Sequence, residues 1–200
     1  MLQLVLATRN EHKRREFARV FAARTAGRRV RLLALSASVA LPPEDGRTFA
    51  ENALPKARAA ATATRQMSIA DDSGIEAAAL GGAPGIRSAR FAGERASDEE
   101  NLDKLLCQAP AGSAVEYVCA LACVDPATGT ERVFKGRCAG RLAAAPRGER
   151  GFGYDPAFLP DDGPAGLTMA ELSDAQKDAI SHRGRAARAM LEWLEEVDRG

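Results

Sequence analysis

The chain has 200 residues, with 28 basic and 27 acidic side chains and a net charge of +1. So small a charge excludes a nucleic-acid binder that is held by bulk electrostatic attraction. Hydrophobic residues make up 46% of the chain, which excludes disorder driven by charge and predicts a buried core. The length is that of one domain, so we expect a single domain over residues 1–200.

No segment has the features of a signal peptide or a membrane span. The apolar run at residues 2–7 is too short for the hydrophobic region of a signal peptide. No run approaches the ~20 apolar residues that a membrane helix needs. Cys119 and Cys123 have the spacing of core thiols on one strand, and no two cysteines form a C-x-x-C pair that would indicate zinc. We therefore expect a reduced, soluble, cytoplasmic protein.

The first half of the chain predicts alternating strands and helices. Buried strands are expected where short runs are apolar, at residues 2–7, 30–35 and 67–70. Helices are expected over about 11–24, from the spacing of its apolar residues, and over about 49–66, which is rich in alanine. Strands and helices that alternate in this way favour an α/β fold.

The start and the middle of the second helix carry specific signals. Thr48 and Glu51 have the spacing of a capping box, in which each side chain bonds the backbone amide of the other. Pro55 should remove one backbone hydrogen bond and bend the helix. After the strand at 67–70, Gly74 is expected to let the chain turn.

The second half of the chain predicts an antiparallel hairpin and two or more helices. Glycine and proline exclude a long regular element between residues 74 and 93. The other expected elements are a helix from the capping box at Ser97 to about 107, a hairpin of 114–124 and 130–138, a long loop over 145–164 and a C-terminal helix over 184–198. Ser173 and Gln176 also have the spacing of a capping box. We therefore expect a mixed β-sheet flanked by helices.

The polar turn Thr8-Arg9-Asn10 is a candidate phosphate site because it joins a strand to the start of a helix. Backbone amides and about half a positive charge gather at such a helix start. Lys13, one turn into the helix, adds a full charge. The segment has no glycine, so it is not a Walker A loop. The alternative is an ordinary helix start with a solvated lysine.

Asp71 and Asp72 form a candidate metal site at the end of an expected strand. Adjacent carboxylates repel one another unless a cation compensates them. Mg²⁺ is suited to this because it takes one or two carboxylates together with phosphate oxygens. Glu44, in a loop before Gly46, is a possible further ligand. The alternative is an aspartate-rich turn with no bound metal.

Two later segments are candidates for binding a base and phosphates. The loop Gly-Phe-Gly-Tyr-Asp-Pro at 151–156 presents aromatic rings, and a ring stacked on a nucleobase contributes roughly 1–3 kcal/mol. Its alternative is a loop pinned by two buried rings. A helix is expected to end near His182, with Gly184 redirecting the chain, so that Lys177, His182 and Arg183 could donate to phosphate. Their alternative is cations that cap the end of a helix.

Six segments together resemble the inosine triphosphate pyrophosphatase family, the XTP/dITP diphosphatases that remove non-standard purine nucleotides. They follow the family's order across nearly the whole chain, and no single motif decides the resemblance. The matching segments are residues 6–13, 48–57, 70–76, 80–93, 151–158 and 168–184.

The resemblance implies a role for each matching position. Asp72 would be the general base and, with Glu44, would bind Mg²⁺. Asp71, Lys13 and Lys56 would support catalysis near the phosphates. Residues of the first turn would hold the triphosphate, and later residues would enclose the base and sugar. The implied substrate contacts are Thr8, Arg9, Asn10, Glu11, His12, Lys13, Ser73, Phe152, Gly153, Tyr154, Asp155, Lys177, His182 and Arg183.

The implied reaction is hydrolysis of ITP, dITP or XTP to the monophosphate and diphosphate, by a homodimer. The resemblance also implies two lobes with the nucleotide cleft between them. The chain departs from the family's pattern at Pro55, at Arg87 and at residues 114–117, where Ala-Val-Glu-Tyr stands in place of Arg-Ala-Arg-Phe. None of these departures is at an implied catalytic position.

Three other functions are weighed against this one. A pyrophosphatase of the Maf type would act on pyrimidine or modified-base nucleotides, and the loops at 151–156 and 180–184 disfavour it. A non-catalytic sensor would bind ITP without releasing diphosphate, and the set of Lys13, Glu44, Asp71 and Asp72 disfavours it. A nucleic-acid module is disfavoured because no basic stripe alternates with aromatic residues.

Overall fold

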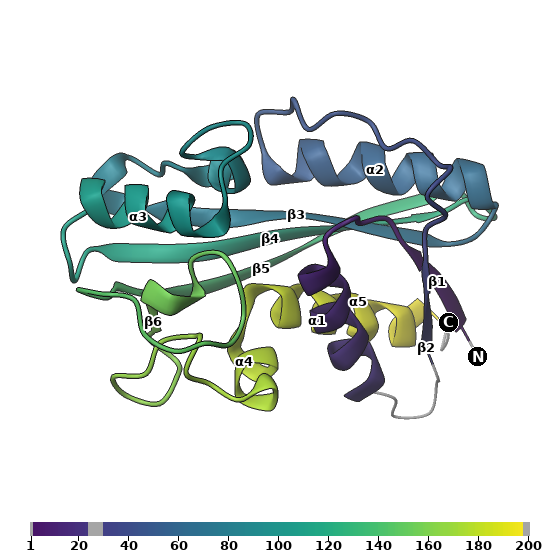
Figure 1. The fold of residues 1–200 in the computed structure, drawn as a ribbon. Helices are drawn as coiled ribbons and strands as arrows, with labels where there is room; N and C mark the ends of the chain where they lie inside the picture. The colour runs from purple at the N-terminus through teal and green to yellow at the C-terminus, as the bar shows by residue number, and fades with distance from the viewer. Residues whose placement is uncertain (1, 24–29, 198–200) are drawn as a thin grey trace. The chain divides into compact units, whose positions relative to one another are not determined.

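The computed structural model describes residues 2–23 and 30–197, and its strands form one six-stranded sheet (Figure 1). The strands are β1 (Leu2–Leu6), β2 (Val30–Ala34), β3 (Ser68–Ala77), β4 (Ala114–Asp125), β5 (Thr130–Leu142) and β6 (Phe158–Pro160). The α-helices of these residues are α1 (Glu11–Ala23), α2 (Phe49–Thr64), α3 (Asp98–Gln108), α4 (Asp174–Ile180) and α5 (His182–Val197). Residues 24 and 198, the expected ends of two helices, lie outside the described residues.

The sheet is mixed, as the sequence predicts. Its strand order is β2-β1-β3-β4-β5-β6. β1 is parallel to both β2 and β3, because a helix connects β1 to β2 and parallel strands need such a crossover. β4 and β5 are joined by the short turn at 126–129, and β6 runs antiparallel to β5. The prediction of a mixed sheet flanked by helices is therefore confirmed.

The described chain divides into two compact units. The first comprises Met1–Asp72, Cys119–Gly136 and Arg183–Gly200, and the second comprises Ser73–Val118 and Arg137–His182. The divisions fall inside β3, β4 and β5, so each of these strands supplies residues to both units. The single domain over residues 1–200 and the nucleotide cleft stay predictions.

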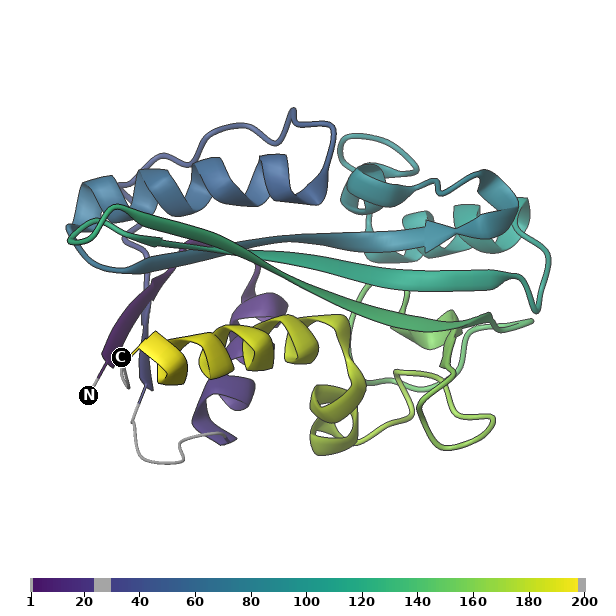
Figure 2. The ribbon, with the colours of Figure 1, turned by 180° about the vertical axis from the view of Figure 1, so that it is seen from behind.

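The first unit has helices on both faces of its strands. Figure 1 and, from behind, Figure 2 show α2 over one face and α1 and α5 against the other. The buried stripe of α2 is mostly alanine, which lets the helix lie close to the strands. The opposite core is built from larger side chains, each contributing roughly 1.5–3 kcal/mol on burial. Its members include Leu4, Leu6, Phe17, Phe21, Ile69, Leu121, Met190 and Leu194.

The second unit has its own core of buried side chains. Val115 and Tyr117 of β4 and Leu142 of β5 pack with Leu105 of α3 and with Phe158 of β6. α3 and α4 each begin with a complete capping box, at Ser97–Glu100 and Ser173–Gln176, as their sequences predict.

Three expectations about the first half of the chain need correction. β3 does not end at residue 70 but continues through the aspartates to Ala77. Gly74 therefore lies within the strand, where a Cβ atom would come within 2.4 Å of the oxygens of Gly85 and Ser88, so its role is close packing and not a turn. The capping box at Thr48 is incomplete, because Glu51 accepts from the amide of Arg47.

Helix α2 continues through Pro55 to Thr64, as the sequence predicts, and the bend expected at Pro55 stays a prediction. Helix α4 ends at Ile180, close to His182 as expected. Two further expectations need correction. The predicted loop at 145–164 contains the short strand β6. Helix α5 begins at His182, so Gly184 lies inside this helix and does not redirect the chain.

None of the helices in residues 2–23 and 30–197 is both long and apolar enough to cross a membrane.

The four cysteines are free thiols, and Cys119, Cys123 and Cys138 are buried. Burial raises the pKa of Cys123 to about 12 and raises that of Cys119 further. Cys119 and Cys123 are thus core thiols, as the sequence predicts.

We expect one of the four thiols to react in the native protein. Cys107 is exposed, whereas the buried thiols can react only when the chain opens. Titration with a disulfide reagent should release one equivalent quickly under native conditions and four in denaturant. Cys107→Ser should abolish the fast phase, and a fast phase of two or more equivalents would contradict the described packing.

Candidate active site

Asp71 is a buried carboxylate of the first unit with cations beside it. Its Oδ2 lies 2.9 Å from Nζ of Lys13, in α1, and 3.6 Å from Nε of Arg183, in α5. Burial alone would raise the pKa of Asp71, but the positive charges of Lys13, Arg183 and Lys56 outweigh burial and lower the pKa to about 2. Asp71 is therefore ionised at neutral pH and serves as the internal counterion of these cations.

Asp72, the next residue of β3, has different surroundings. Successive side chains of a strand point to opposite faces of the sheet. Oδ2 of Asp72 accepts a hydrogen bond of 2.8 Å from Nδ2 of Asn52, in α2. Burial and the negative charge of Glu44 raise the pKa of Asp72, against the lowering effect of Lys13, Asn52 and Lys56. The two neighbouring carboxylates are thus shifted in opposite directions.

Lys56 joins α2 to both acidic segments. Its Nζ pairs with the Glu44 carboxylate and donates to the backbone carbonyl of Asp71 at 2.7 Å. Burial would lower the pKa of Lys56, but the charges of Asp71 and Glu44 raise it above its ordinary value. The structure therefore brings together Glu44, Lys56, Asp71 and Asp72, as the resemblance implied.

Asn52 is a site residue that the sequence reasoning missed. Its Nδ2 donates to Asp72, and its Oδ1 accepts from the amide of Gly46 at 2.8 Å. A Cβ atom at Gly46 would lie 2.7 Å from that same Oδ1, so glycine permits the close approach. Asn52 thus fixes the loop of Glu44 beside Asp72. Asn52 lies four residues before Lys56, on a helix stripe that is otherwise apolar. This spacing in the sequence indicated that the two polar side chains share one buried face.

The polar turn before α1 uses its side chains to cap the helix. The hydroxyl of Thr8 accepts from the amide of Asn10 at 3.2 Å, and Oδ1 of Asn10 accepts from the amide of Lys13 at 3.0 Å. The Arg9 guanidinium donates to the carbonyls of four loop residues, Leu35, Ser36, Ala37 and Val39. The Arg9 side chain therefore holds that loop. The turn would then contact a ligand through its backbone amide groups.

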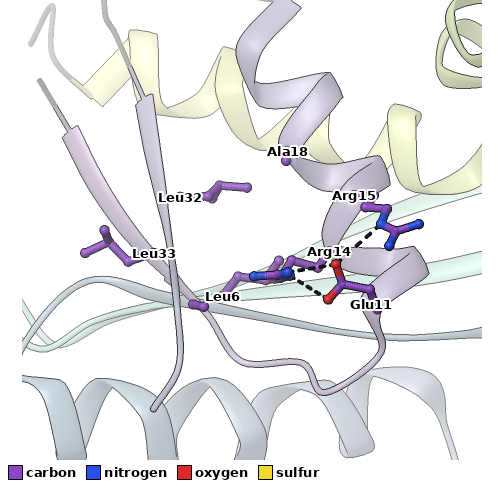
Figure 3. A pocket seen from close by; sticks show the side chains of 8 residues that line it. Leu6, Glu11, Arg14, Arg15, Ala18, Leu32 and Leu33 are labelled. Carbon is purple, nitrogen blue, oxygen red and sulfur yellow. Dashed lines mark hydrogen bonds and ion pairs between the residues drawn. The ribbon is translucent and has the colours of Figure 1, made fainter. Parts of the chain in front are cut away.

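Glu11 and His12 follow at the exposed start of α1. The Glu11 carboxylate accepts two hydrogen bonds from Arg14, the shorter at 2.7 Å, and pairs with Arg15 (Figure 3). It faces a pocket of about 240 Å³. The pocket is lined by Leu6, Glu11, Arg14, Arg15, Ala18, Leu32, Leu33 and Ala34, and only Glu11 among these is a predicted site residue.

Glu16 is a second residue that the sequence reasoning missed. It is a buried acid in α1 whose Oε2 lies 3.0 Å from Nη1 of Arg183. Arg183 thus lies between two carboxylates, those of Glu16 and Asp71. Because both acids are buried, the pairing fixes the orientation of the guanidinium. Nothing in the position of Glu16 within a charged helix distinguished it from its exposed neighbours.

The carboxylates of Asp72 and Glu44 fit the predicted magnesium site. Glu44 raises the pKa of Asp72, so the two groups are close enough to repel, and both present the oxygen ligands that Mg²⁺ prefers. Within residues 2–23 and 30–197, no three histidine, cysteine or acidic side chains are grouped to hold a metal ion by themselves. Oxygen atoms of a substrate and of water would therefore have to complete the coordination.

In the second unit, Asp155 organises the loop at 151–155. Its Oδ2 accepts from the amide of Phe152 at 2.9 Å and from Nζ of Lys177 at 2.5 Å. Its Oδ1 accepts from the hydroxyl of Tyr117 at 3.1 Å. Lys177 also lies 5.3 Å from the centre of the Phe152 ring. The Asp155 carboxylate therefore holds the loop and Lys177 in place, and the Lys177 side chain reaches into the loop instead of capping its own helix.

The two rings of this loop differ in exposure. Tyr154 is buried, and its hydroxyl donates to the carbonyl of Ser88 at 2.7 Å, so it pins the loop as the alternative reading supposed. Phe152 is half-buried and keeps an accessible face. The amide of Gly153 donates to Asp98 at the start of α3. Ser73, half-buried in β3, belongs to this unit as well.

We expect Gly151→Ala to destabilise the protein far more than Gly153→Ala. Both glycines have positive φ, +76° and +61°. A Cβ atom at Gly151 would lie 2.1 Å from Oδ2 of Asp155, whereas one at Gly153 would meet nothing within 4 Å. Strain alone costs roughly 1–2 kcal/mol, and the collision adds roughly 1–3 kcal/mol. Urea unfolding of both variants measures the difference, and equal losses would contradict the packing around Asp155.

The chain is similar in sequence and in fold to proteins of one known family. The model of the Ham1 family matches residues 4–193. A dITP/XTP pyrophosphatase of Cutibacterium acnes is 47% identical over 197 residues, which cover 96% of this chain and 95% of that protein. A HAM1 protein from Coxiella burnetii has a similar structure, with a TM-score of 0.84, 36% identity and coverage of 98% of this chain and 100% of that one.

A crystal structure described as a nucleoside-triphosphatase and dITP/XTP pyrophosphatase from Mycobacterium abscessus is 40% identical. It covers 95% of this chain and 99% of its own, with a TM-score of 0.71. These relatives match over nearly their full lengths, and the family model matches all but the ends of the chain. With its acidic pair in β3 and the cations around it, the chain belongs to the Ham1 family.

Proposed function

We propose that the protein hydrolyses non-standard purine nucleoside triphosphates, ITP, dITP and XTP, to the monophosphate and diphosphate. It is a hydrolase of phosphoanhydride bonds, as the names of its relatives suggest. The observation that carries the proposal is the cluster of the first unit, in which Lys13, Lys56 and Arg183 surround the adjacent carboxylates of β3. The implied homodimer stays a prediction.

The cations of this cluster suit a polyphosphate ligand. Hydrolysis of a phosphoanhydride requires charge neutralisation and an aligned water more than covalent chemistry. Lys13 retains partial exposure, with 15% of its side chain accessible, and pairs with Asp71. The capped turn at residues 8–10 lies at the start of the same helix and adds a positive dipole. Together they form the triphosphate subsite.

Asp72 is the general base. Asp71 is buried and pairs through Oδ2 with Lys13 and Arg183, whereas Asp72 accepts a hydrogen bond from Asn52 and lies in the neighbourhood of Glu44. A carboxylate fixed in this way can align a water molecule and accept its proton. Mg²⁺ held by Asp72 and Glu44 would supply charge neutralisation and polarise that water.

Residues of the second unit recognise the base. The half-buried ring of Phe152 offers a stacking face, with the Lys177 cation beside it. His182 can donate a hydrogen bond to the 6-oxo group of hypoxanthine or xanthine. Adenine presents an amino donor at that position, so ATP would leave the His182 donor unpaired at a cost of about 1–3 kcal/mol.

We expect diphosphate release from ITP and XTP with Mg²⁺, little release from ATP, GTP, UTP or dTTP, and none in EDTA. The acidic pair explains the need for Mg²⁺, and the His182 donor explains the low activity on ATP. GTP shares the 6-oxo group of ITP, and its rejection, like that of the pyrimidine nucleotides, is expected because the resemblance implies non-standard purine substrates. Coupled detection of diphosphate measures it. Activity mainly on UTP or dTTP would indicate a pyrimidine-type enzyme. Binding of ITP without release of diphosphate would indicate a sensor.

We expect Asp72→Asn to lower kcat for ITP by roughly 100-fold or more, which is the contribution typical of a general base. Asparagine keeps the size of the side chain and an oxygen that can accept from Asn52, so the thermal midpoint should change little. Asp103→Asn, which alters an exposed carboxylate of α3, is the control and should leave kcat unchanged. Near-normal turnover of Asp72→Asn would contradict the assigned role.

A further inference from the structure

Tyr117 contacts His182, which the proposed function assigns to the base, and Asp155, which holds Phe152 and Lys177 of the same site. It lies in β4 with 6% of its surface exposed. Its hydroxyl donates to Oδ1 of Asp155 at 3.1 Å. Its ring stacks on that of His182, with centroids 4.6 Å apart and an angle of 12° between the planes. Both partners belong to the second unit, as does Tyr117.

The hydroxyl fixes the rotation of the Asp155 carboxylate. Oδ2 of Asp155 accepts from the Phe152 amide and from Lys177, while Oδ1 accepts from Tyr117. A carboxylate held on both oxygens cannot rotate about its Cβ–Cγ bond without breaking a hydrogen bond. The direction in which Lys177 and the Phe152 loop are held therefore depends on the phenol as well as on the carboxylate.

The ring of Tyr117 fixes the plane of His182. Parallel rings at this separation have the offset-stacked geometry that aromatic pairs prefer. His182 begins α5, and its ring is buried. Phe158 also stacks on Tyr117, with centroids 4.4 Å apart. A phenylalanine at position 117 would keep both stacks and lose the hydrogen bond to Asp155, so the contributions of the ring and of the hydroxyl can be separated.

We propose that Tyr117 is a positioning residue for base selectivity. It orients Asp155 and His182 and does not contact the base. The proposal rests on the proposed function, because it assigns the base to Phe152, Lys177 and His182. Tyr117 itself touches no substrate. Its influence is confined to the second unit and should leave the acidic cluster of β3 unaltered.

The test is Tyr117→Phe in the full-length protein. We expect the KM for ITP to rise roughly five- to tenfold, which is within the range that one typical intramolecular hydrogen bond is worth, with kcat within about twofold of wild type. We expect the preference for ITP over GTP and ATP to fall. Thr168→Val is the matched control, because it removes another buried hydroxyl of the second unit, one that donates to the carbonyl of Arg147 at 2.8 Å.

The results for the two variants distinguish an effect of Tyr117 on substrate binding from an effect on protein stability alone. A lower thermal midpoint in both variants, with KM and selectivity unchanged, would overturn the proposal. Tyr117→Phe should add little to KM in an Asp155→Asn background, because the hydroxyl acts through that carboxylate. Additive effects would also overturn it. A wild-type protein that releases no diphosphate from ITP or XTP would overturn the proposed function, and this inference with it.

Discussion

The free-energy cost of burying two adjacent carboxylates in β3 determines how the polar side chains of the first unit are arranged. An ionised side chain in a protein interior is expensive unless it is paired and hydrogen-bonded. Because β3 is extended, Asp71 and Asp72 point to opposite faces of the sheet, so each carboxylate has its own hydrogen-bond or ion-pair partners. The helices on the two faces meet this requirement separately, with Lys13 and Arg183 beside Asp71 and Asn52 beside Asp72.

The opposite pKa shifts of the two aspartates follow from this division. Asp71 meets full positive charges, which lower its pKa to about 2 in spite of burial. Burial and Glu44 raise the pKa of Asp72, and together they outweigh the lowering effect of Lys13, Asn52 and Lys56. Two neighbours of identical chemistry thus differ in pKa because their environments differ.

In the second unit, a single buried carboxylate holds polar groups in place in a similar way. Asp155 is buried, and it gathers an ammonium group, a backbone amide and a phenol around its two oxygens. Gly151 leaves the space that this requires, since a Cβ atom there would collide with the carboxylate. In each unit a buried acid therefore orders side chains that carry charge or aromatic surface, and the loops themselves need little regular structure.

The sequence by itself determined the fold class, most elements and the composition of the candidate site. Apolar spacing located α1, α2 and the β4–β5 hairpin, and the capping boxes at Ser97 and Ser173 began α3 and α4 where expected. These features are local, and local propensity decides them. The resemblance of six segments named the acids and cations that the structure brings together in the first unit.

The tertiary structure decided what each polar side chain does. The aspartates indicated a turn, yet β3 continues through them because cations from distant helices stabilise them inside the sheet. Packing between segments far apart in the chain gives Asn52 and Glu16 their partners. The same kind of packing brings backbone carbonyls to the Arg9 side chain. Pairing energies of this kind depend on distance and burial in three dimensions, and a linear sequence carries neither.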